Sequence, residues 1–206
     1  MSTSEQVQTK SKVDVKTSIA LSGVLRHQVV KLGLDIDSEG FVDVNQILKL
    51  GKFKNVTVDD IKRIVETNDK ARFKLETRGD VLFVRANQGH SKDVGAELDD
   101  EKVLKKITEP LPVCVHGTYA DVIKQIQKDG LKSQTRKHIH FATGLFGDPD
   151  VKSGIRKDCT ALVYIDMKKA MEDGIEFFLS DNGVILTSGT NDVVLPKYFS
   201  NVVTRK

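Results

Sequence analysis

Apolar residues recur at helical spacing in the first third of the chain. A helix is predicted for residues 18–31, with Ser18 as its N-cap and Gly33 as its left-handed stop. Its buried face repeats every three or four residues, at Leu21, Val24, Leu25 and Leu32. Shorter helices are predicted after Asp43 and after Thr57, where acidic residues in the first turn suit the helix dipole.

Extended segments follow these helices. Residues 72–77 and 81–85 are rich in strand-forming side chains and predict an antiparallel hairpin that turns at Arg78-Gly79-Asp80. Three short helices followed by a hairpin have the layout of a winged-helix-like lobe. A polar, glycine-containing loop comes next, and the charged stretch at 91–108 is predicted to be the boundary of that lobe.

The second half of the chain is predicted to be rich in strands. Short β-prone runs occupy residues 113–116, 138–142, 161–165, 175–179, 184–186, 192–195 and 201–204. Two helices are predicted, at 118–128 with Thr118 as N-cap and at 167–172. Between them, residues 144–158 are expected to form a long loop with one helical turn near Ser153.

This order of elements predicts an α+β protein of two lobes, at residues 15–100 and 101–206, preceded by a disordered tail at 1–14. The chain has no Gly-x-Gly-x-x-Gly after a strand and no Walker A sequence, which disfavours a Rossmann or P-loop fold.

Charge and cysteine content limit the functional classes. The net charge of +3 is too small for a polybasic nucleic-acid-binding surface, so any claim about RNA must rest on individual arginines. The two cysteines, Cys114 and Cys159, are typical of a reducing compartment. No apolar run is long enough for a membrane span and no signal peptide is visible, so an intracellular protein is expected, in the nucleus or the cytoplasm.

Three of the five histidines lie between His116 and His140. If His138 and His140 are in a strand, both imidazoles leave the same face. Gly117 and Thr118 precede a helical pattern, and free N–H groups at a helix start can bind phosphate or pyrophosphate. These features predict a nucleotide-handling cleft. Zinc bound by histidines and Cys114 is the alternative, although no Cys-x-x-Cys accompanies them.

Six motifs, in this order, carry a resemblance to a known family. They are Leu25-Arg26-His27, Asn68-Asp69-Lys70-Ala71-Arg72-Phe73, Gln88-Gly89-His90-Ser91, His116-Gly117-Thr118, His138-Ile139-His140 and Ser153-Gly154-Ile155-Arg156. Together they resemble the NAD-dependent RNA 2′-phosphotransferases that finish tRNA splicing. The resemblance runs from about Val15 to the C-terminus and takes in all five histidines.

The resemblance implies an RNA-binding winged-helix-like lobe and an NAD-binding lobe like that of ADP-ribosyltransferases. In that family, the RNA 2′-phosphate attacks the nicotinamide ribose of NAD, and nicotinamide leaves. The 2″-hydroxyl then attacks the phosphodiester of the RNA-2′-phospho-ADP-ribose intermediate. The products are 2′-OH RNA and ADP-ribose 1″,2″-cyclic phosphate.

The resemblance also assigns roles to individual residues. The implied catalytic residues are Arg26, His27, Arg72 and Arg156. The implied RNA 2′-phosphate-binding residues are Arg26, His27 and Arg72, with Gln88 and His90 as further candidates. The implied NAD-binding residues are His116, Gly117, Thr118, His140, Ser153 and Arg156. Arginine suits these roles because its planar fork binds phosphate bidentately and stays charged.

Other functions stay open at this level. Many protein-modifying ADP-ribosyltransferases carry a glutamate on a late strand, whereas the late hairpin here turns at Asp181-Asn182-Gly183 and has none. A phosphate acceptor is already anionic and needs no base, so this difference favours phosphate. A non-catalytic RNA- or ADP-ribose-binding module, or a transferase acting on other phosphorylated acceptors, is the alternative. A monomer is the simplest expectation, and no metal is expected.

Overall fold

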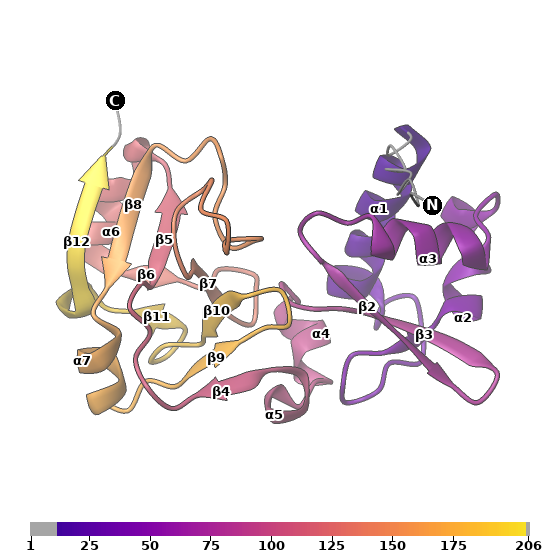
Figure 1. The fold of residues 1–206 in the computed structure, drawn as a ribbon. Coiled ribbons are helices and arrows are strands. Elements are labelled where there is room, and N and C mark those ends of the chain that lie inside the picture. Colours follow the sequence, from indigo (N-terminus) through magenta and orange to yellow (C-terminus); the bar gives the residue numbers. More distant parts are fainter. Residues whose placement is uncertain (1–11, 205–206) are drawn as a thin grey trace, which may run out of the picture.

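The computed structural model describes residues 12–204 and contains helices together with several β-sheets. The N-terminal elements are α1 (Lys12–Gly23), the π-helix η1 (Val24–Gln28), β1 (Val42–Asp43), α2 (Val44–Leu48), the 3₁₀-helix η2 (Gly51–Phe53), α3 (Val58–Glu66), β2 (Phe73–Arg78) and β3 (Val81–Ala86). The strands form a three-stranded sheet in the order β1-β3-β2. Figure 1 shows this group on the right, with α1, α2 and α3 packed together.

Local sequence explains where several of these elements begin. The side chain of Asp43 accepts a hydrogen bond from the backbone N–H of Asn45 and so caps α2. Thr57 and Asp60 form a capping box at the start of α3, as the sequence predicted. The predicted hairpin is also confirmed, because Arg78 pairs with Val81 across a two-residue turn.

The first helix differs from its prediction. It begins by Lys12, so the predicted disordered tail is wrong at residues 12–14, and residues 1–11 lie outside the described part of the chain. Asp14 bonds to Arg63 of α3 at 2.8 Å, which anchors the first turn of α1. Ser18 is therefore inside the helix rather than its cap, and its hydroxyl accepts from the amide of Asn68. Gly33 ends this helical region at φ +65°, as predicted.

The charged stretch that was predicted to be a lobe boundary is folded. It contains α4 (Lys92–Ala96), α5 (Asp100–Val103) and β4 (Lys105–Ile107). These elements are short and charged, so contacts with distant residues stabilise them more than their own sequence pattern of apolar residues does. Asp100 of α5 pairs with both Lys137 and His138, nearly forty residues further along the chain.

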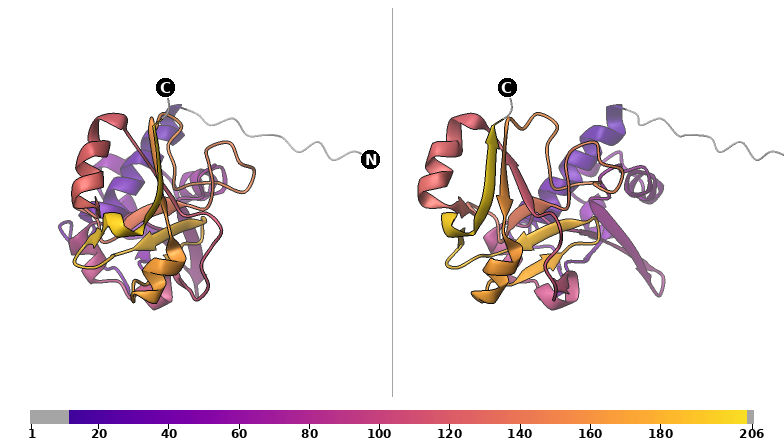
Figure 2. Two further views of the ribbon diagram at one scale, coloured as in Figure 1. Left: turned by 90° about the vertical axis from the view of Figure 1, so that its left-hand side faces the viewer. Right: turned by 60° about the vertical axis from the view of Figure 1, so that its left-hand side comes forward.

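A seven-stranded antiparallel sheet forms the rest of the structure, in the order β12-β8-β5-β7-β10-β9-β4. Its further elements are β5 (Val115–Thr118), the 3₁₀-helix η3 (Ala120–Val122), α6 (Ile123–Asp129), β6 (Leu131–Lys132), β7 (Ile139–Ala142), β8 (Ala161–Ile165), α7 (Met167–Glu172), β9 (Phe177–Leu179), β10 (Val184–Thr187), β11 (Val193–Val194), the 3₁₀-helix η4 (Pro196–Tyr198) and β12 (Phe199–Thr204). Strands β6 and β11 pair separately. Figure 2 shows α6 beside this sheet.

Two predictions in this half are wrong. Gly117 and Thr118 are the last residues of β5, paired with Leu162 and Ala161 of β8, so they do not open a helix. The β-branched threonine fits the strand, and the helical region begins only at Ala120. The loop after β7 has no helical turn near Ser153, and bends with Gly154 at φ +96° take its place.

The three-stranded and the seven-stranded sheets each have an apolar core, and a smaller cluster lies between them. Leu98, Val103 and Leu104 pack with residues of β9 and β10, and Ile36 from the N-terminal group contacts the same cluster. Polar contacts cross at the turn between β9 and β10, where Asn182 donates to the carbonyl of Lys70 at 2.9 Å. The two groups of elements therefore share a packed and hydrogen-bonded boundary.

No helix within residues 12–204 has the length and apolar character needed to cross a membrane.

Candidate active site

Arg26 lies in the π-helix η1, which follows α1 directly. A π-helix has hydrogen bonds between residues five apart, so each turn is wider than in an α-helix. The backbone carbonyl of Arg26 accepts from both the N–H and the hydroxyl of Ser91, each at 2.9 Å. The guanidinium is largely buried, yet its Nε and Nη2 have no hydrogen-bond partner. Buried donors without a partner are rare, and here they are free to bind an anion.

Four arginines from separate segments of the chain influence one another electrostatically: Arg26, Arg72, Arg136 and Arg156. Burial, together with the charges of Arg136 and Arg72, lowers the pKa of Arg26 to about 10. Arg136 in turn has its pKa lowered by burial and by Arg156. None of these four arginines belongs to any ion pair found among residues 12–204. Together they form a cluster of positive charge, which we call the arginine cluster, that is not balanced by acids.

His27 lies beside this cluster on the solvent side of η1. Partial burial and the charges of Arg26 and Arg136 lower its pKa, while Asp93 raises it. One residue of the Arg-His pair is thus largely buried and the other is exposed, because adjacent residues of a helix point about 100° apart.

Arg72 and Arg156 each make a side-chain hydrogen bond within the protein. The backbone N–H and the Nη1 of Arg72 both donate hydrogen bonds to Asn68 Oδ1, at 3.2 and 3.4 Å. Arg72 follows Ala71, which has φ +41°, an uncommon value for a residue with a side chain. Exposed Arg156 donates to the hydroxyl of Tyr119 at 3.3 Å, and that hydroxyl donates to Asp158.

The loop that follows β3 packs the Gln-Gly-His motif against Arg26. Buried Gln88 accepts from His140 Nε2 at 3.0 Å, which ties this loop to β7. His90 is buried, and its Nε2 has no hydrogen-bond partner. Burial, with a contribution from Arg26, lowers the pKa of His90 to about 3, so it is neutral at physiological pH.

Gly89 gives a test of how closely Arg26 is packed. It has φ +89°, and a Cβ there would lie 3.3 Å from Arg26 Nε. We expect Gly89→Ala to cost about 1–2 kcal/mol in backbone strain and, by displacing Arg26, to lower kcat/KM about 10–100-fold. Thermal melting and steady-state assays on a 2′-phosphorylated RNA would measure both.

The matched control is Gly79→Ala, in the hairpin turn. Gly79 has φ +60°, but a Cβ there would meet no atom within 4 Å. It should therefore show a similar loss of thermal stability with unchanged kcat/KM. Equal activity losses in the two variants would show that Gly89 acts only on the backbone.

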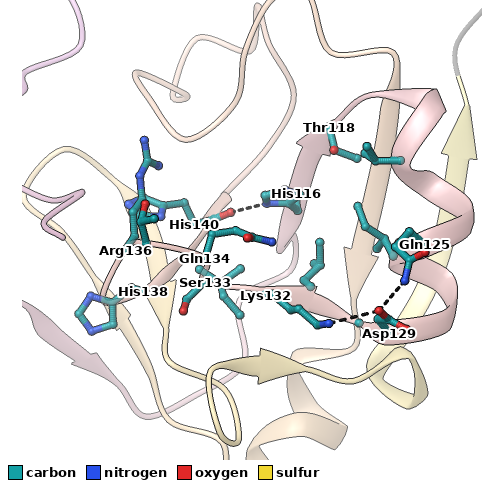
Figure 3. Close-up of a pocket in the computed structure, with 16 residues that line it drawn as sticks. His116, Thr118, Gln125, Asp129, Lys132, Ser133, Gln134, Arg136, His138 and His140 are labelled. Carbon is teal, nitrogen blue, oxygen red and sulfur yellow. Dashed lines mark hydrogen bonds and ion pairs between the residues drawn. The ribbon is translucent and has the colours of Figure 1, made fainter. Parts of the chain in front are cut away.

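A pocket of about 490 Å³ lies between α6 and the segment that leads into β7 (Figure 3). It is lined by His116, Thr118, Val122, Gln125, Ile126, Asp129, Gly130, Leu131, Lys132, Ser133, Gln134, Thr135, Arg136, His138, Ile139 and His140. Its size lies within the range of small-molecule sites. Arg136 connects it electrostatically to the arginine cluster.

The imidazole ring of His116 lines this pocket, and a hydrogen bond fixes its orientation. Its Nδ1 donates to the carbonyl of His140 at 2.8 Å, drawn as a dashed line in Figure 3. Burial is the main reason that its pKa is lowered. With Nδ1 protonated and the ring neutral, Nε2 is an acceptor, which suits a hydroxyl group.

A second pocket, of about 380 Å³, lies among the N-terminal elements, next to Arg26 and Arg72. Arg26 and Arg72 line it together with residues of α1 and α3. The structure thus brings Arg26 and Arg72 to one pocket and His116, Thr118 and His140 to another. Ser153 lines neither pocket, and nor do Arg156 and Gly117, although Ile155 and Cys159 of the loop lie against Gly117.

Metal chemistry has little support in this geometry. Among residues 12–204, no group of three or more histidine, cysteine or acidic residues is arranged to hold an ion. His138 bonds to Asp100, and Cys114 is buried with a thiol pKa raised by that burial. The alternative of a zinc site at these histidines is therefore not favoured.

Comparison with known proteins shows the family to which this chain is related. A family model described as "RNA 2′-phosphotransferase, Tpt1 / KptA family" matches residues 12–189. The chain belongs to this family. It is 45% identical over 190 residues to "tRNA 2′-phosphotransferase 1" of Danio rerio, covering 91% of this chain and 84% of the relative. It is 38% identical over 191 residues to "tRNA 2′-phosphotransferase" of Saccharomyces cerevisiae, covering 89% and 82%.

A further relative is longer than this chain. The "Putative tRNA 2′-phosphotransferase" of Schizosaccharomyces pombe is 48% identical over 194 residues, covering 92% of this chain and 51% of the relative. The chain therefore spans about half the length of that protein.

Arg136 is the member of the arginine cluster that sequence reasoning did not single out. None of the six motifs includes it. Its position two residues before His138 was the available signal, because alternate residues of an extended segment share a face. Tyr119, which orients Arg156, follows the fourth family motif directly and was also missed.

Proposed function

We propose that this chain is an NAD-dependent tRNA 2′-phosphotransferase. It removes the internal 2′-phosphate left by tRNA splicing and transfers it to NAD through an RNA-2′-phospho-ADP-ribose intermediate. The products are 2′-OH RNA, nicotinamide and ADP-ribose 1″,2″-cyclic phosphate. The names of the relatives support tRNA with a 2′-phosphate as the substrate. The arginine cluster, with its buried unpaired donors, is the observation that carries the chemistry.

In this proposal the N-terminal elements are the winged-helix-like lobe that binds RNA. The C-terminal sheet is the ADP-ribosyltransferase-like lobe that binds NAD. Arg26 and Arg72 hold the 2′-phosphate, because both line one pocket and Arg26 has free buried donors. His27, with a lowered pKa beside these cations, is neutral near pH 7 and acts as a donor or proton shuttle.

The pocket beside α6 takes NAD. His116, Thr118 and His140 line it, and neutral His116 offers Nε2 to a ribose hydroxyl. Arg136 faces the diphosphate, since it lines the pocket and belongs to the arginine cluster. Gly117 and Ser153 are assigned to NAD binding by the family resemblance alone, since neither lines this pocket.

Arg156 acts chiefly in the second step. It lies close enough to both Arg136 and His116 to lower their pKa values, so it can contact the phosphodiester and the NAD side together. The attack of the 2″-hydroxyl adds negative charge at phosphorus, and a guanidinium at that point lowers the barrier.

The turn between β9 and β10 is consistent with a phosphate acceptor. Asp181 is its only acid, and it pairs with Arg85 at 2.9 Å and with Lys74 at 3.4 Å. It lies in neither pocket described above. A carboxylate that is tied to two cations is poorly suited to activate a neutral hydroxyl acceptor.

The deciding experiment combines the protein with NAD and an oligoribonucleotide that carries one internal 2′-phosphate. We expect nicotinamide release and loss of the 2′-phosphate in equal amounts, with neither when NAD is omitted. Binding of the RNA without nicotinamide release would reject the enzyme in favour of a binding module. Transfer of ADP-ribose to a phosphorylated acceptor without the second step would identify a different transferase.

A further inference from the structure

The backbone just before Arg72 is held in an unfavourable conformation. Ala71 has φ +41°, in the left-handed region where a Cβ comes too close to the next carbonyl oxygen. The N–H of Ala71 donates to the carbonyl of Asn68 at 2.8 Å and closes the turn that leads from α3 into β2. Other contacts must hold Ala71 in this conformation, and with it the direction in which the Arg72 side chain leaves the backbone.

Asn87 holds both carbonyl groups that flank Arg72. Its side-chain Nδ2 donates to the carbonyl of Ala71 at 2.7 Å, and its backbone N–H donates to the carbonyl of Arg72 at 2.9 Å. The peptide group between Ala71 and Arg72 is also held at its other end, where the N–H of Arg72 donates to Asn68 Oδ1 at 3.2 Å. Asn87 thus fixes two successive peptide groups, one on each side of the Arg72 Cα.

The side chain of Asn87 is buried and contributes only its donor. It is 4% exposed and directly follows Ala86, which pairs with Phe73 at the end of the β2–β3 hairpin. Its Oδ1 has no hydrogen-bond partner within residues 12–204. A buried acceptor without a partner costs free energy, as does the conformation of Ala71. Strained backbone and unpaired buried groups of this kind cluster where a site must keep one geometry.

We propose that Asn87 is a positioning residue for Arg72. Its side-chain amide keeps Ala71 in the left-handed region and so directs the Arg72 guanidinium at the 2′-phosphate. The inference rests on the proposed function, in which Arg72 binds that phosphate, and adds what sets its direction. Asn68 contacts the guanidinium itself, whereas Asn87 acts on the backbone that carries it.

The test measures the affinity of the full chain for two fluorescent oligoribonucleotides by anisotropy, without NAD. The two RNAs differ only in one internal 2′-phosphate, so the ratio of their affinities reports how well the phosphate is bound. Asn87→Ala removes the side-chain amide and leaves the backbone hydrogen bond to Arg72 in place. We expect it to lower the ratio about tenfold, because a buried carbonyl loses its partner. The affinity for the RNA without the phosphate should not change.

A second substitution separates positioning from a general loss of stability. Glycine adopts positive φ without a steric penalty, so Ala71→Gly removes the strain against which Asn87 acts. Relative to Ala71→Gly alone, the addition of Asn87→Ala should lower the ratio no more than about twofold, because the two residues are coupled. A side chain that only stabilised the fold would give the same loss in both backgrounds.

Thr187→Val is the matched control. Thr187 is also fully buried, and its hydroxyl donates to a backbone carbonyl, that of Glu176, at 2.6 Å. The variant should lower the melting temperature as Asn87→Ala does and leave the ratio unchanged. The proposal is overturned if Asn87→Ala keeps the ratio of the unmodified protein, or lowers it equally with and without Ala71→Gly. A protein that shows the expected binding but releases no nicotinamide from NAD would reject the proposed function alone.

Discussion

Replacing Arg72 with alanine is expected to slow removal of the 2′-phosphate about 10²–10³-fold. Arg72 and Arg26 line one pocket, and no acid among residues 12–204 forms an ion pair with either of them. Asn68 orients the Arg72 guanidinium, so its fork is presented to the ligand before binding. The loss should appear in kcat/KM for the 2′-phosphorylated RNA, with the melting temperature little changed because Arg72 is only half-buried.

Two variants control for charge and position. Arg72→Lys keeps the positive charge but loses the bidentate fork, so its activity should lie between the unmodified protein and Arg72→Ala. Lys74→Ala removes a cation two residues away, on β2, whose partner is Asp181. It should keep nearly full activity. If Lys74→Ala were as impaired as Arg72→Ala, the effect would come from general charge and not from a phosphate contact.

Replacing Arg156 with alanine is expected to separate the two steps. RNA-2′-phospho-ADP-ribose should accumulate, because the second step should slow about 100-fold while nicotinamide release slows less. The structural reason is that Arg156 lies near Arg136 and His116, which line the pocket that we propose for NAD, and outside the pocket that holds Arg26 and Arg72. Single-turnover reactions with labelled RNA, resolved by chromatography, would show the intermediate.

The neighbouring Lys157→Ala variant is the control, since Lys157 is exposed in the same loop. It should complete both steps at the normal rate. If Arg156→Ala released no nicotinamide and had lost NAD binding, Arg156 would belong to NAD binding and its assignment to the second step would be wrong.

Elements with strong local signals could be predicted from the sequence. The capping box at Thr57 and Asp60, the Asp43 cap and the hairpin turn at Gly79 each stabilise their own element, and all three are present. Short contacts of this kind depend on residues a few positions apart, so a local pattern is enough to reveal them.

Features that depend on distant contacts could not be predicted in this way. Thr118 extends β5 because β8, forty residues later, pairs with it. Helix α5 depends on Asp100 meeting Lys137 and His138. Arg136 joins the arginine cluster only because the loop after β3 and the segment before β7 are hydrogen-bonded side by side, at Ser91, Lys92 and Lys137.

The contact between Asn182 and Lys70 bears on how members of this family can be recombined. Asn182 is buried, accepts from Ser180, and donates to the carbonyl of Lys70, two residues before Arg72. A chimera that joined the N-terminal half of one relative to the C-terminal half of another would keep both apolar cores. It would still misplace Arg72 unless residue 182 remained a donor of the same length, whereas position 70 supplies only its backbone carbonyl and can be any residue.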